Sequence, residues 1–385
     1  MPPLRHIMPL FQTPPSSICI LRLSAIGDCC HALALVRVIQ RAWPTTRITW
    51  ITGKIEATLF ADLPGVEVIA FDKSKGWRGY RELWQTLQGR RFDALLHLQA
   101  AMRASIATLG IKAKVKLGFD RERASDGQWL FTNHPVPSPA SPHVLDGFLA
   151  FAKELGIQDL TPDLQLPIST EHQAWAKEKI GGKPTLLICA AASKAFKNWT
   201  AAGYAALADH AASKGFQVYL CGGPAKLEQD LAANIQRLSH SKPVDLVGQT
   251  NLKQLLALIK EASLVLAPDT GPAHMATLVG TPVLGLYAHH NPDRTGPYLC
   301  RDYAVSVYQE LIEQETGKPL AELGWRTRRK DPDAMGKITS ERVIAAFDRL
   351  CADRQLPAGQ QLGISEQGSR DNLLARPHGG RQNGG

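Results

Sequence analysis

The chain has 385 residues, 44% hydrophobic and 21% charged, which is ordinary for a globular protein and long enough for two domains. The formal charge of +9 favours an acidic partner, such as a phosphorylated small molecule, an anionic membrane surface or nucleic acid. The seven cysteines are scattered, which argues against a disulfide framework or a zinc site and favours reduced thiols in the cytoplasm. Because no uninterrupted apolar run reaches about 18 residues, the sequence predicts no membrane-spanning helix.

The first half of the chain alternates short apolar runs with helical patterns. We expect residues 1–16 to form a flexible arm, because they hold no apolar core of the length that a secretory signal needs. Residues 28–42 keep their apolar side chains on one face, which predicts an amphipathic helix. Strands are expected at 17–22, 47–51, 67–71, 93–98 and 114–119. This alternation predicts βαβ units and a parallel sheet.

The second half repeats the pattern after a break. A polar, proline-rich passage (133–143), a helix (145–156) and an extended linker (157–167) come first. Strands are then expected at 185–190, 216–221, 244–248, 263–267 and 283–287, with an amphipathic helix at 252–262 capped by Thr250 or Asn251. The polar, glycine-rich segment 351–385 is expected to be disordered.

These elements predict an α/β fold of two doubly wound, Rossmann-like domains, at 17–160 and 161–350, that face each other across a cleft. In such sheets ligands bind beyond the carboxyl ends of the strands. The polar residues in the loops that follow strands are therefore the candidate site residues.

The strongest local signal is "APDTGPAHMATLVGTPVLGLYAHHNPDRTGPY" at 267–298, where a strand runs into a tight turn and a short helix. Gly271 allows a ligand to approach the backbone, and the helix-start N–H groups with the Thr270 hydroxyl suit a diphosphate. His274 could add a donor, and Asp269 could orient backbone or sugar hydroxyls. The alternative is that Asp269 caps the helix and His274 packs in the core.

A second strand-loop-helix passage, "CAAASKAFKNWTAAGYAAL" at 189–207, carries Ser193, Lys194 and Lys197 in its loop. A lysine at this position could neutralise a departing phosphate without a metal ion. The alternative is a solvated surface lysine, and Lys197 is the stronger candidate of the two.

A third loop, "CGGPAKLEQD" at 221–230, could hold a nucleoside. The backbone at Gly222 and Gly223 would contact it, and Glu228 could reach a ribose or a base. The alternative is an ordinary glycine-proline turn.

The stretch "LRLSAIGDCCHA" at 21–32 places Asp28 at the start of a helix, directly after the turn that begins at Ser24. The positive end of the helix favours the ionised carboxylate, so Asp28 could act as a base. The alternative is a simple helix cap. The chain lacks the G-x-G-x-x-G fingerprint, so this loop does not resemble a dinucleotide site.

Basic residues gather near the expected strand ends of the first half. They could hold an anionic acceptor, or they could be ordinary surface charge, and aromatic residues are not interleaved with them as in RNA-binding surfaces. The set comprises Arg22, Arg103, Lys112, Lys114, Lys116, Arg121 and Arg123.

From about residue 17 to 350 the sequence resembles the bacterial lipopolysaccharide heptosyltransferases, the ADP-heptose-dependent enzymes of glycosyltransferase family 9. The resemblance lies in "RLSAIGD" before a helix, "KNW" before a helix, and "DTGPAHMA" followed by "GTPVLGLYAHHNPDRTGPY". It implies the two-domain GT-B fold, with the donor on the C-terminal domain and the acceptor on the N-terminal one. The sequence departs from the family pattern at His289 and His290, which replace a glycine-containing turn, and at 308–335.

Carried over by position, the resemblance implies that Asp28 is the general base and that Lys197 contacts phosphate. It makes Asp269, Thr270, Gly271 and His274 the D-T-G-x-x-H motif, and Glu228 the acid that contacts the nucleoside, with Ser193 and Gly222 beside the donor. Arg22, Ser24, Arg103, Arg121 and Arg123 would then contact the acceptor.

The implied activity is inverting transfer of a heptose from ADP-heptose to a lipopolysaccharide core or related glycolipid acceptor, with no metal and no cofactor. The expected partners are the nucleotide-sugar donor, an anionic glycolipid and the inner membrane surface, but no nucleic acid, and the expected location is the cytoplasm. Two alternatives stay open. One is an epimerase that acts on a nucleotide sugar alone, and the other is a non-catalytic binding module.

Overall fold

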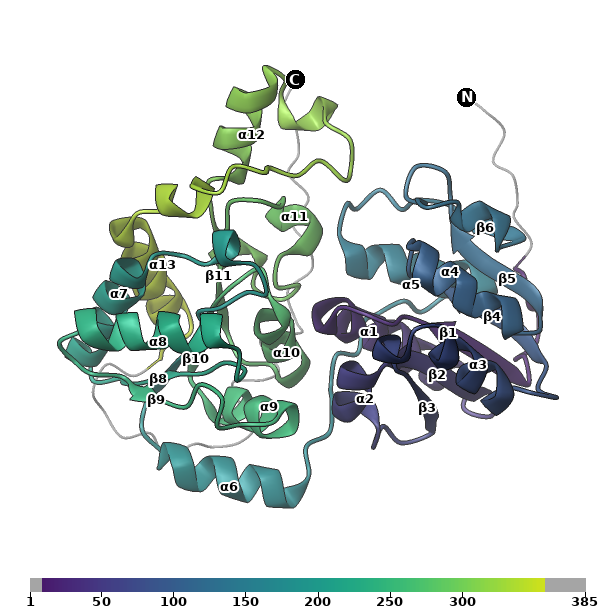
Figure 1. Ribbon diagram of the computed structural model, residues 1–385, viewed down its shortest axis with the longest axis horizontal. Helices are drawn as coiled ribbons and strands as arrows, with labels where there is room; N and C mark the ends of the chain where they lie inside the picture. The colour runs from purple at the N-terminus through teal and green to yellow at the C-terminus, as the bar shows by residue number, and fades with distance from the viewer. Residues whose placement is uncertain (1–8, 357–385) are drawn as a thin grey trace.

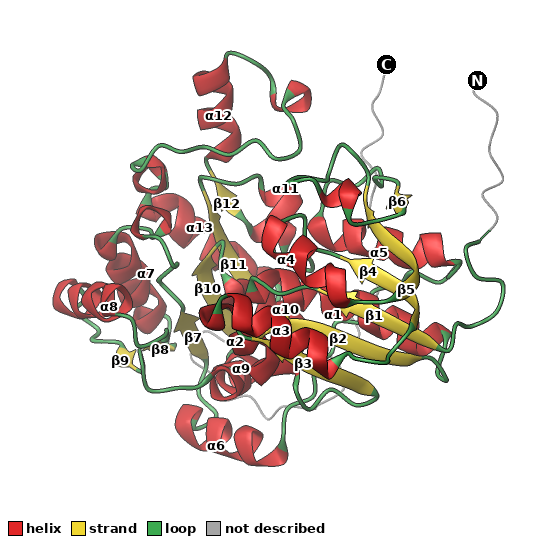
Figure 2. Ribbon diagram, turned by 45° about the vertical axis from the view of Figure 1, so that its right-hand side comes forward, coloured by secondary structure: helices red, strands yellow, loops and turns green. Residues whose placement is uncertain are grey.

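The computed structural model describes residues 9–356, which form two α/β lobes, each with one six-stranded parallel sheet (Figures 1 and 2). In Figure 1 the N-terminal lobe is purple to blue and the C-terminal lobe is teal to yellow. The expected pair of doubly wound domains is therefore confirmed.

The N-terminal sheet has the strand order β3-β2-β1-β4-β5-β6. Its strands are β1 (Ser17–Leu21), β2 (Arg47–Gly53), β3 (Val66–Phe71), β4 (Phe92–His97), β5 (Ala113–Phe119) and β6 (His134–Val136). Its helices are α1 (Ile26–Ala42), α2 (Lys54–Phe60), α3 (Trp77–Thr86), α4 (Met102–Ala107) and α5 (Val144–Leu155). Ile18 and Ile20 pack in one core and Cys19 and Leu21 in another, so β1 is covered on both faces and its sequence is continuously apolar.

The C-terminal sheet has the order β12-β11-β10-β7-β8-β9. Its strands are β7 (Thr185–Ile188), β8 (Gln217–Leu220), β9 (Val244–Asp245), β10 (Leu264–Pro268), β11 (Val283–Tyr287) and β12 (Val305–Ser306). Its helices are α6 (Thr170–Ile180), α7 (Ala201–Ser213), α8 (Lys226–Leu238), α9 (Leu252–Glu261), α10 (Gly271–Val279), α11 (Pro292–Thr295), α12 (Tyr308–Thr316) and α13 (Ser340–Asp353). Asn251 caps α9 and exchanges hydrogen bonds with Gln254, as one of the two predicted caps.

The lobes meet where α1 packs against α10 (Figure 1). A Cβ atom at Gly271, in the first turn of α10, would lie 3.2 Å from Ile26 Cβ in α1. A larger residue there would have to push the helices apart, so the glycine sets how closely the two lobes approach. One hydrophobic core is continuous across this contact, which fixes the carboxyl edges of the two sheets near each other.

Several predicted boundaries differ from the structure. The passage 133–143 contains a strand, β6, because His134–Val136 pairs with β5. The predicted strand at 244–248 shortens to Val244–Asp245, and β12 was not predicted because only two residues pair.

The ends of the described chain also differ. Residues 9–16 do not form a loose arm: the Leu10 and Phe11 N–H groups donate to the Glu154 and Leu155 carbonyls, at 3.3 and 3.0 Å. The expected tail boundary at 351 falls inside α13, which continues to Asp353. The remaining parts of the expected arm (1–8) and tail (357–385) lie outside the described residues.

All seven cysteines carry free thiols, and six of them are buried. Within residues 9–356, none of the helices combines the length and the hydropathy that a bilayer crossing requires.

Candidate active site

Four loops meet between the lobes, and each follows a strand at the point where the strand order of its sheet reverses. In the N-terminal sheet these are the loops after β1 and β4, and in the C-terminal sheet they are the loops after β7 and β10. Doubly wound folds bind ligands at such switch points. The loops carry, in order, Asp28, Gln99, Lys197 and Asp269.

Asp28 lies in the first turn of α1 with one third of its side chain exposed. Its carboxylate forms an ion pair with Arg22 and accepts a hydrogen bond from the Ala25 N–H at 3.4 Å. Gln99 supports the same turn, because its side-chain oxygen accepts from the Leu23 N–H at 2.8 Å. The carboxylate is thus both accessible and fixed, as a base requires.

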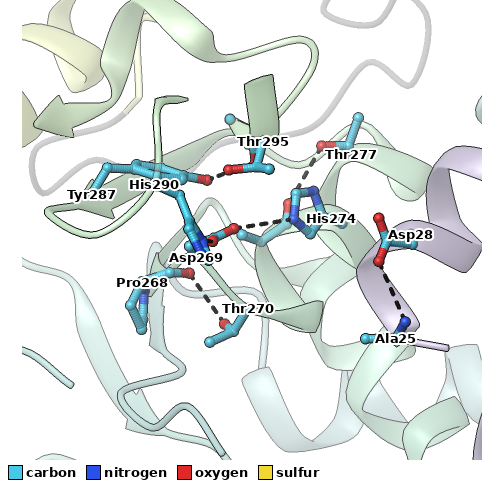
Figure 3. Close-up of polar contacts among 12 residues, drawn as sticks. Ala25, Asp28, Pro268, Asp269, Thr270, His274, Thr277, Tyr287, His290 and Thr295 are labelled. Carbon is cyan, nitrogen blue, oxygen red and sulfur yellow. Dashed lines mark hydrogen bonds and ion pairs between the residues drawn. The ribbon is translucent and has the colours of Figure 1, made fainter. Parts of the chain in front are cut away.

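The N-terminal lobe presents Asp28 directly to the donor motif of the other lobe. Gly27 touches the imidazole of His274 so closely that a Cβ atom there would overlap the ring. Figure 3 shows Asp28 beside His274, with Asp269 and Thr270 close by. The structure therefore places Asp28 next to the predicted donor motif.

Arg22 holds Asp28 in place rather than standing free for an acceptor. Besides the ion pair, its Nη1 donates to the Leu98 carbonyl at 2.6 Å, and its guanidinium lies 5.5 Å from the Phe148 ring centroid. Ser24, also predicted to contact the acceptor, is half-buried and bonded to Gln99.

Asp269 is the centre of a charged cluster in the other lobe (Figure 3). It contacts His290 Nδ1, and its oxygens lie 3.8 Å from His274 Nε2 and 3.9 Å from Lys197 Nζ. Burial would raise the pKa of Asp269, but the contacts with His274, His290 and Lys197 outweigh burial and hold that pKa well below its ordinary value. Asp269 is therefore ionised. It does not cap α10, because Thr270 is the N-cap residue and its side chain makes no capping hydrogen bond.

The start of α10 is a smaller donor set than the sequence predicted. Pro272 has no N–H, and the Ala273 N–H donates to the Thr270 carbonyl at 3.2 Å. Gly271 is the residue of this first turn whose N–H has no hydrogen bond to the described part of the chain. The Thr270 hydroxyl donates to the Pro268 carbonyl at 3.2 Å.

Lys197 belongs to the cluster, whereas its loop neighbours do not. Burial lowers the pKa of Lys197, and Asp269 opposes that effect. Lys194 and Ser193 are exposed. His289 holds the loop in place, because its ring nitrogens lie 3.0 Å from the Phe196 carbonyl and 3.2 Å from the Arg329 carbonyl.

In the loop after β8, the carboxylate of Glu228 contacts the glycines of the same loop. Glu228 accepts a hydrogen bond from the Gly223 N–H at 2.6 Å, and its carboxylate packs against Gly222. This arrangement orders the loop, and Glu228 would have to turn outward to contact a nucleoside.

The predicted acceptor arginines separate into two kinds. Arg103 and Arg121 are exposed. Arg123 is 4% exposed and donates to the Ser141 carbonyl at 3.0 Å, so it is part of the fold.

Sequence reasoning missed the roles of Gln99 and His290. Gln99 lies two residues after the end of β4, and its position just beyond a strand was a usable signal. His290 was noted only as a departure from the family pattern. Its role depends on a contact with Asp269 that joins the loops after β10 and β11, and the sequence alone does not show such a contact.

Comparison with known proteins identifies the family of the chain. Residues 80–323 match the sequence profile of glycosyltransferase family 9 (heptosyltransferase). The chain is 49% identical over 344 residues to the lipopolysaccharide core heptosyltransferase OpsX of Haemophilus influenzae, which covers 89% of this chain and 99% of OpsX.

Solved structures share the fold. A family 9 glycosyltransferase from Veillonella parvula has a TM-score of 0.72 and 21% identity, covering 90% of this chain and 99% of that chain. The Escherichia coli heptosyltransferase WaaC, solved with ADP, has a TM-score of 0.66 and 19% identity, covering 86% and 99%.

The fold and these matches define the protein as a glycosyltransferase of the two-domain GT-B type. The chain belongs to glycosyltransferase family 9, the heptosyltransferase family. The predicted family, fold and enzyme class are thereby confirmed.

Three histidines line the contact between the lobes. The ring centroids of His31 and His274 are 4.6 Å apart, and those of His31 and His143 are 5.1 Å apart. The His143 Nε2–H donates to the Gly296 carbonyl at 3.0 Å, and Nδ1 accepts from the Leu145 N–H at 3.1 Å. Burial lowers the pKa of His143 to about 4 and holds the pKa of His31 well below its usual value.

Acid is therefore expected to destabilise the protein between pH 6.5 and 5. The folded state keeps His31 and His143 neutral, while the unfolded state binds protons below about pH 6.5. Stability then falls with decreasing pH by up to about 1.4 kcal/mol per unit for each histidine. Urea unfolding at pH 7.5, 6.0 and 5.0 measures this slope. His143→Gln should reduce this slope, and His240→Gln, at an exposed histidine, should not. A wild-type profile that is flat down to pH 5 would refute the interpretation.

Proposed function

We propose that this chain transfers a heptose from ADP-heptose to an anionic saccharide of the lipopolysaccharide core, with inversion at the anomeric carbon. The near-full-length match to a lipopolysaccharide core heptosyltransferase supports the donor and acceptor classes. The single observation that carries the mechanism is the contact of Gly27 with His274, because it sets Asp28 beside the donor motif.

In the proposed reaction Asp28 accepts the proton of an acceptor hydroxyl. The oxygen forms a bond to the anomeric carbon as the bond from that carbon to the ADP phosphate oxygen breaks. ADP leaves with the electron pair, and Lys197 and the Gly271 N–H stabilise its new charge. Arg22 holds the base in place through its ion pair with Asp28.

The donor cradle fits an anion that arrives from the cleft. Lys197 supplies the positive charge of the cradle, since its ammonium lies 3.9 Å from the Asp269 carboxylate, whereas burial lowers the pKa of His290. A pocket lined by Lys197, Asp269 and His290 has space for roughly one water molecule, at about 10 Å³. The diphosphate would therefore lie at the mouth of this pocket and not inside it.

A donor screen tests the function. Purified protein is incubated with ADP-, UDP- and GDP-sugars and a deacylated lipopolysaccharide precursor, and products are read by mass spectrometry. The expected product is the precursor plus one heptose, formed from ADP-heptose. Incubation with ADP-heptose alone should give only slow hydrolysis; conversion of the donor to an epimer without acceptor would support the epimerase alternative, and ADP binding without transfer would support the binding module.

We also propose that the N-terminal lobe docks on the inner membrane through a surface at the carboxyl edge of its sheet. Its apolar members are exposed and follow β2, β3, β4 and β5, the same edge that carries Asp28. They are Ile55, Trp77, Met102, Trp129 and Leu130. Exposed basic residues accompany them, including Lys54, Arg78, Arg103 and Arg121. Apolar side chains among cations suit an anionic bilayer surface and would bring a lipid-anchored acceptor to the site.

Replacing Trp77 and Leu130 together with serine is expected to weaken binding to phosphatidylglycerol-containing vesicles by at least about tenfold. These side chains are 60% and 77% exposed, so the fold loses little. Vesicle co-sedimentation measures the effect, and added salt should weaken binding further. Leu238→Ser on α8 is the matched control, being exposed on the other lobe. Unchanged vesicle binding by the double variant would overturn the docking proposal.

A further inference from the structure

The segment after β11 reaches across to the N-terminal lobe, although the sequence marked 308–335 only as atypical. The Trp325 indole N–H donates to the Pro142 carbonyl at 2.7 Å, and Arg326 donates to the Arg123 carbonyl. Nearer to β11, the Tyr298 hydroxyl donates to Asp146 at 2.8 Å. The segment thus forms one wall of the space between the lobes.

Three guanidinium groups surround the indole of Trp325. The Cζ atoms of Arg294, Arg123 and Arg326 lie 4.1, 4.8 and 5.8 Å from the ring centroid. We call these three residues the arginine cluster. One indole can attract a cation, but three cations on one ring repel each other unless an anion joins them.

The charge of the arginine cluster is not neutralised by direct contact. None of the three guanidinium groups forms an ion pair within residues 9–356, and the buried Nε atoms of all three have no hydrogen bond there. Buried polar groups of a native protein usually have partners, so this arrangement is unusual. Carboxylates influence the cluster through their charge, without direct contact with the guanidinium groups. Arg123 is influenced by Asp120, Glu122 and Asp146, and Arg326 by Asp126. Arg294 is influenced by Asp28 and Asp269.

The position of Arg294 relates the cluster to the reaction. The charges of Asp28, from the N-terminal lobe, and Asp269, from the C-terminal lobe, both act on this guanidinium. Arg294 also belongs to α11, directly after the loop that carries His290. The cluster therefore lies beside the space in which acceptor and donor would meet.

We propose that the arginine cluster binds an anionic group, a phosphate or a carboxylate, of the acceptor saccharide and so places its hydroxyl at Asp28. This inference rests on the proposed function. Under this proposal both domains bind the acceptor, because Arg294 and Arg326 come from the C-terminal domain. The sequence had predicted acceptor contacts from N-terminal residues alone. Planar guanidinium groups suit such anions because they can donate two parallel hydrogen bonds.

The donor diphosphate is the competing source of the same chemistry. The charge of Arg328 acts on Lys197 and His290 and also on Arg294 and Arg326, so an anion near this arginine could belong to either substrate. The experiment must therefore measure anion binding while the donor site is filled.

The first arm uses inorganic phosphate as the probe. Phosphate is titrated by calorimetry into the full-length protein saturated with ADP. Wild type should bind it, Arg294→Ala should weaken binding at least about tenfold, and Arg294→Lys should restore part of the affinity. Arg349→Ala is the matched control, because Arg349, on α13, also lies over an aromatic ring. Its Cζ atom is 5.4 Å from the ring centroid of Tyr303, and its replacement should leave the phosphate affinity unchanged. Equal phosphate affinity in wild type and Arg294→Ala would overturn the proposal.

The second arm measures transfer to a deacylated precursor before and after phosphatase treatment. Arg294→Ala and Arg326→Ala should raise the acceptor KM about 10–100-fold and leave the Kd for ADP within twofold. A weakened ADP affinity with an unchanged acceptor KM would assign the cluster to the donor and contradict the proposal. Absence of transfer by wild type would contradict the proposed function alone, because the phosphate arm still decides whether the anion site exists.

Discussion

Asp28→Ala is expected to lower kcat for heptose transfer by about 10²–10⁴-fold, the usual contribution of a well-placed general base. This corresponds to about 3–5 kcal/mol of transition-state stabilisation. The Kd for ADP should stay within twofold, because the donor cradle is built by Lys197, Asp269 and α10 of the other lobe. Single-turnover transfer and calorimetric ADP titration measure the two quantities separately.

Asp28→Asn distinguishes proton transfer from positioning. The amide keeps the shape and one oxygen that can accept from the Ala25 N–H, so the fold of the turn should persist. A loss of kcat equal to that of alanine assigns the effect to the proton. Asp230→Asn, an exposed aspartate on α8, serves as the control. If Asp28→Asn keeps wild-type turnover, the base is another group.

Lys197→Ala is expected to reduce kcat about 10²–10³-fold and to raise the donor KM, since removal of one preformed donor to a developing negative charge has this effect. The variant also leaves Asp269 with His290 and His274 as its remaining partners. The uncompensated carboxylate would then repel the leaving diphosphate. Steady-state kinetics with varied ADP-heptose measure both parameters.

Lys194→Ala is the matched control for Lys197→Ala. The two lysines share one loop, but Lys194 is exposed and points its ammonium toward Phe196, 5.8 Å from the ring centroid. Its removal should leave kcat and the donor KM within twofold. An equal loss of kcat in both variants would show that catalysis depends on the conformation of the loop and not on the Lys197 ammonium.

The sequence predicted the fold because the fold depends on local patterns, and the same patterns drew attention to the candidate site residues. Continuous apolar runs between helical stretches define parallel strands that are covered on both faces, as β1 shows. Asp28, Lys197 and Asp269 lie in the segments that follow β1, β7 and β10, and the order of strands brings these segments to two facing edges. The ends of strands can be recognised in a sequence, and so can the polar residues that come after them.

The remaining features depend on contacts between distant segments. The pairing of His290 with Asp269 joins two loops of one sheet, and the contact of Gly27 with His274 joins the two lobes. Arg123, predicted to contact the acceptor, packs against Trp325, which lies about 200 residues further along the chain. A spacing pattern carries no information on such contacts, because they follow from how the lobes pack.

The account depends most on where the two substrates lie relative to Asp28. A crystal structure of the protein with ADP and a deacylated acceptor measures this directly. The account predicts the ADP phosphates at Lys197 and the start of α10, and an acceptor hydroxyl about 2.6–3.2 Å from the Asp28 carboxylate. ADP bound at that cradle with the acceptor hydroxyl turned away from Asp28, or ADP bound elsewhere, would contradict it.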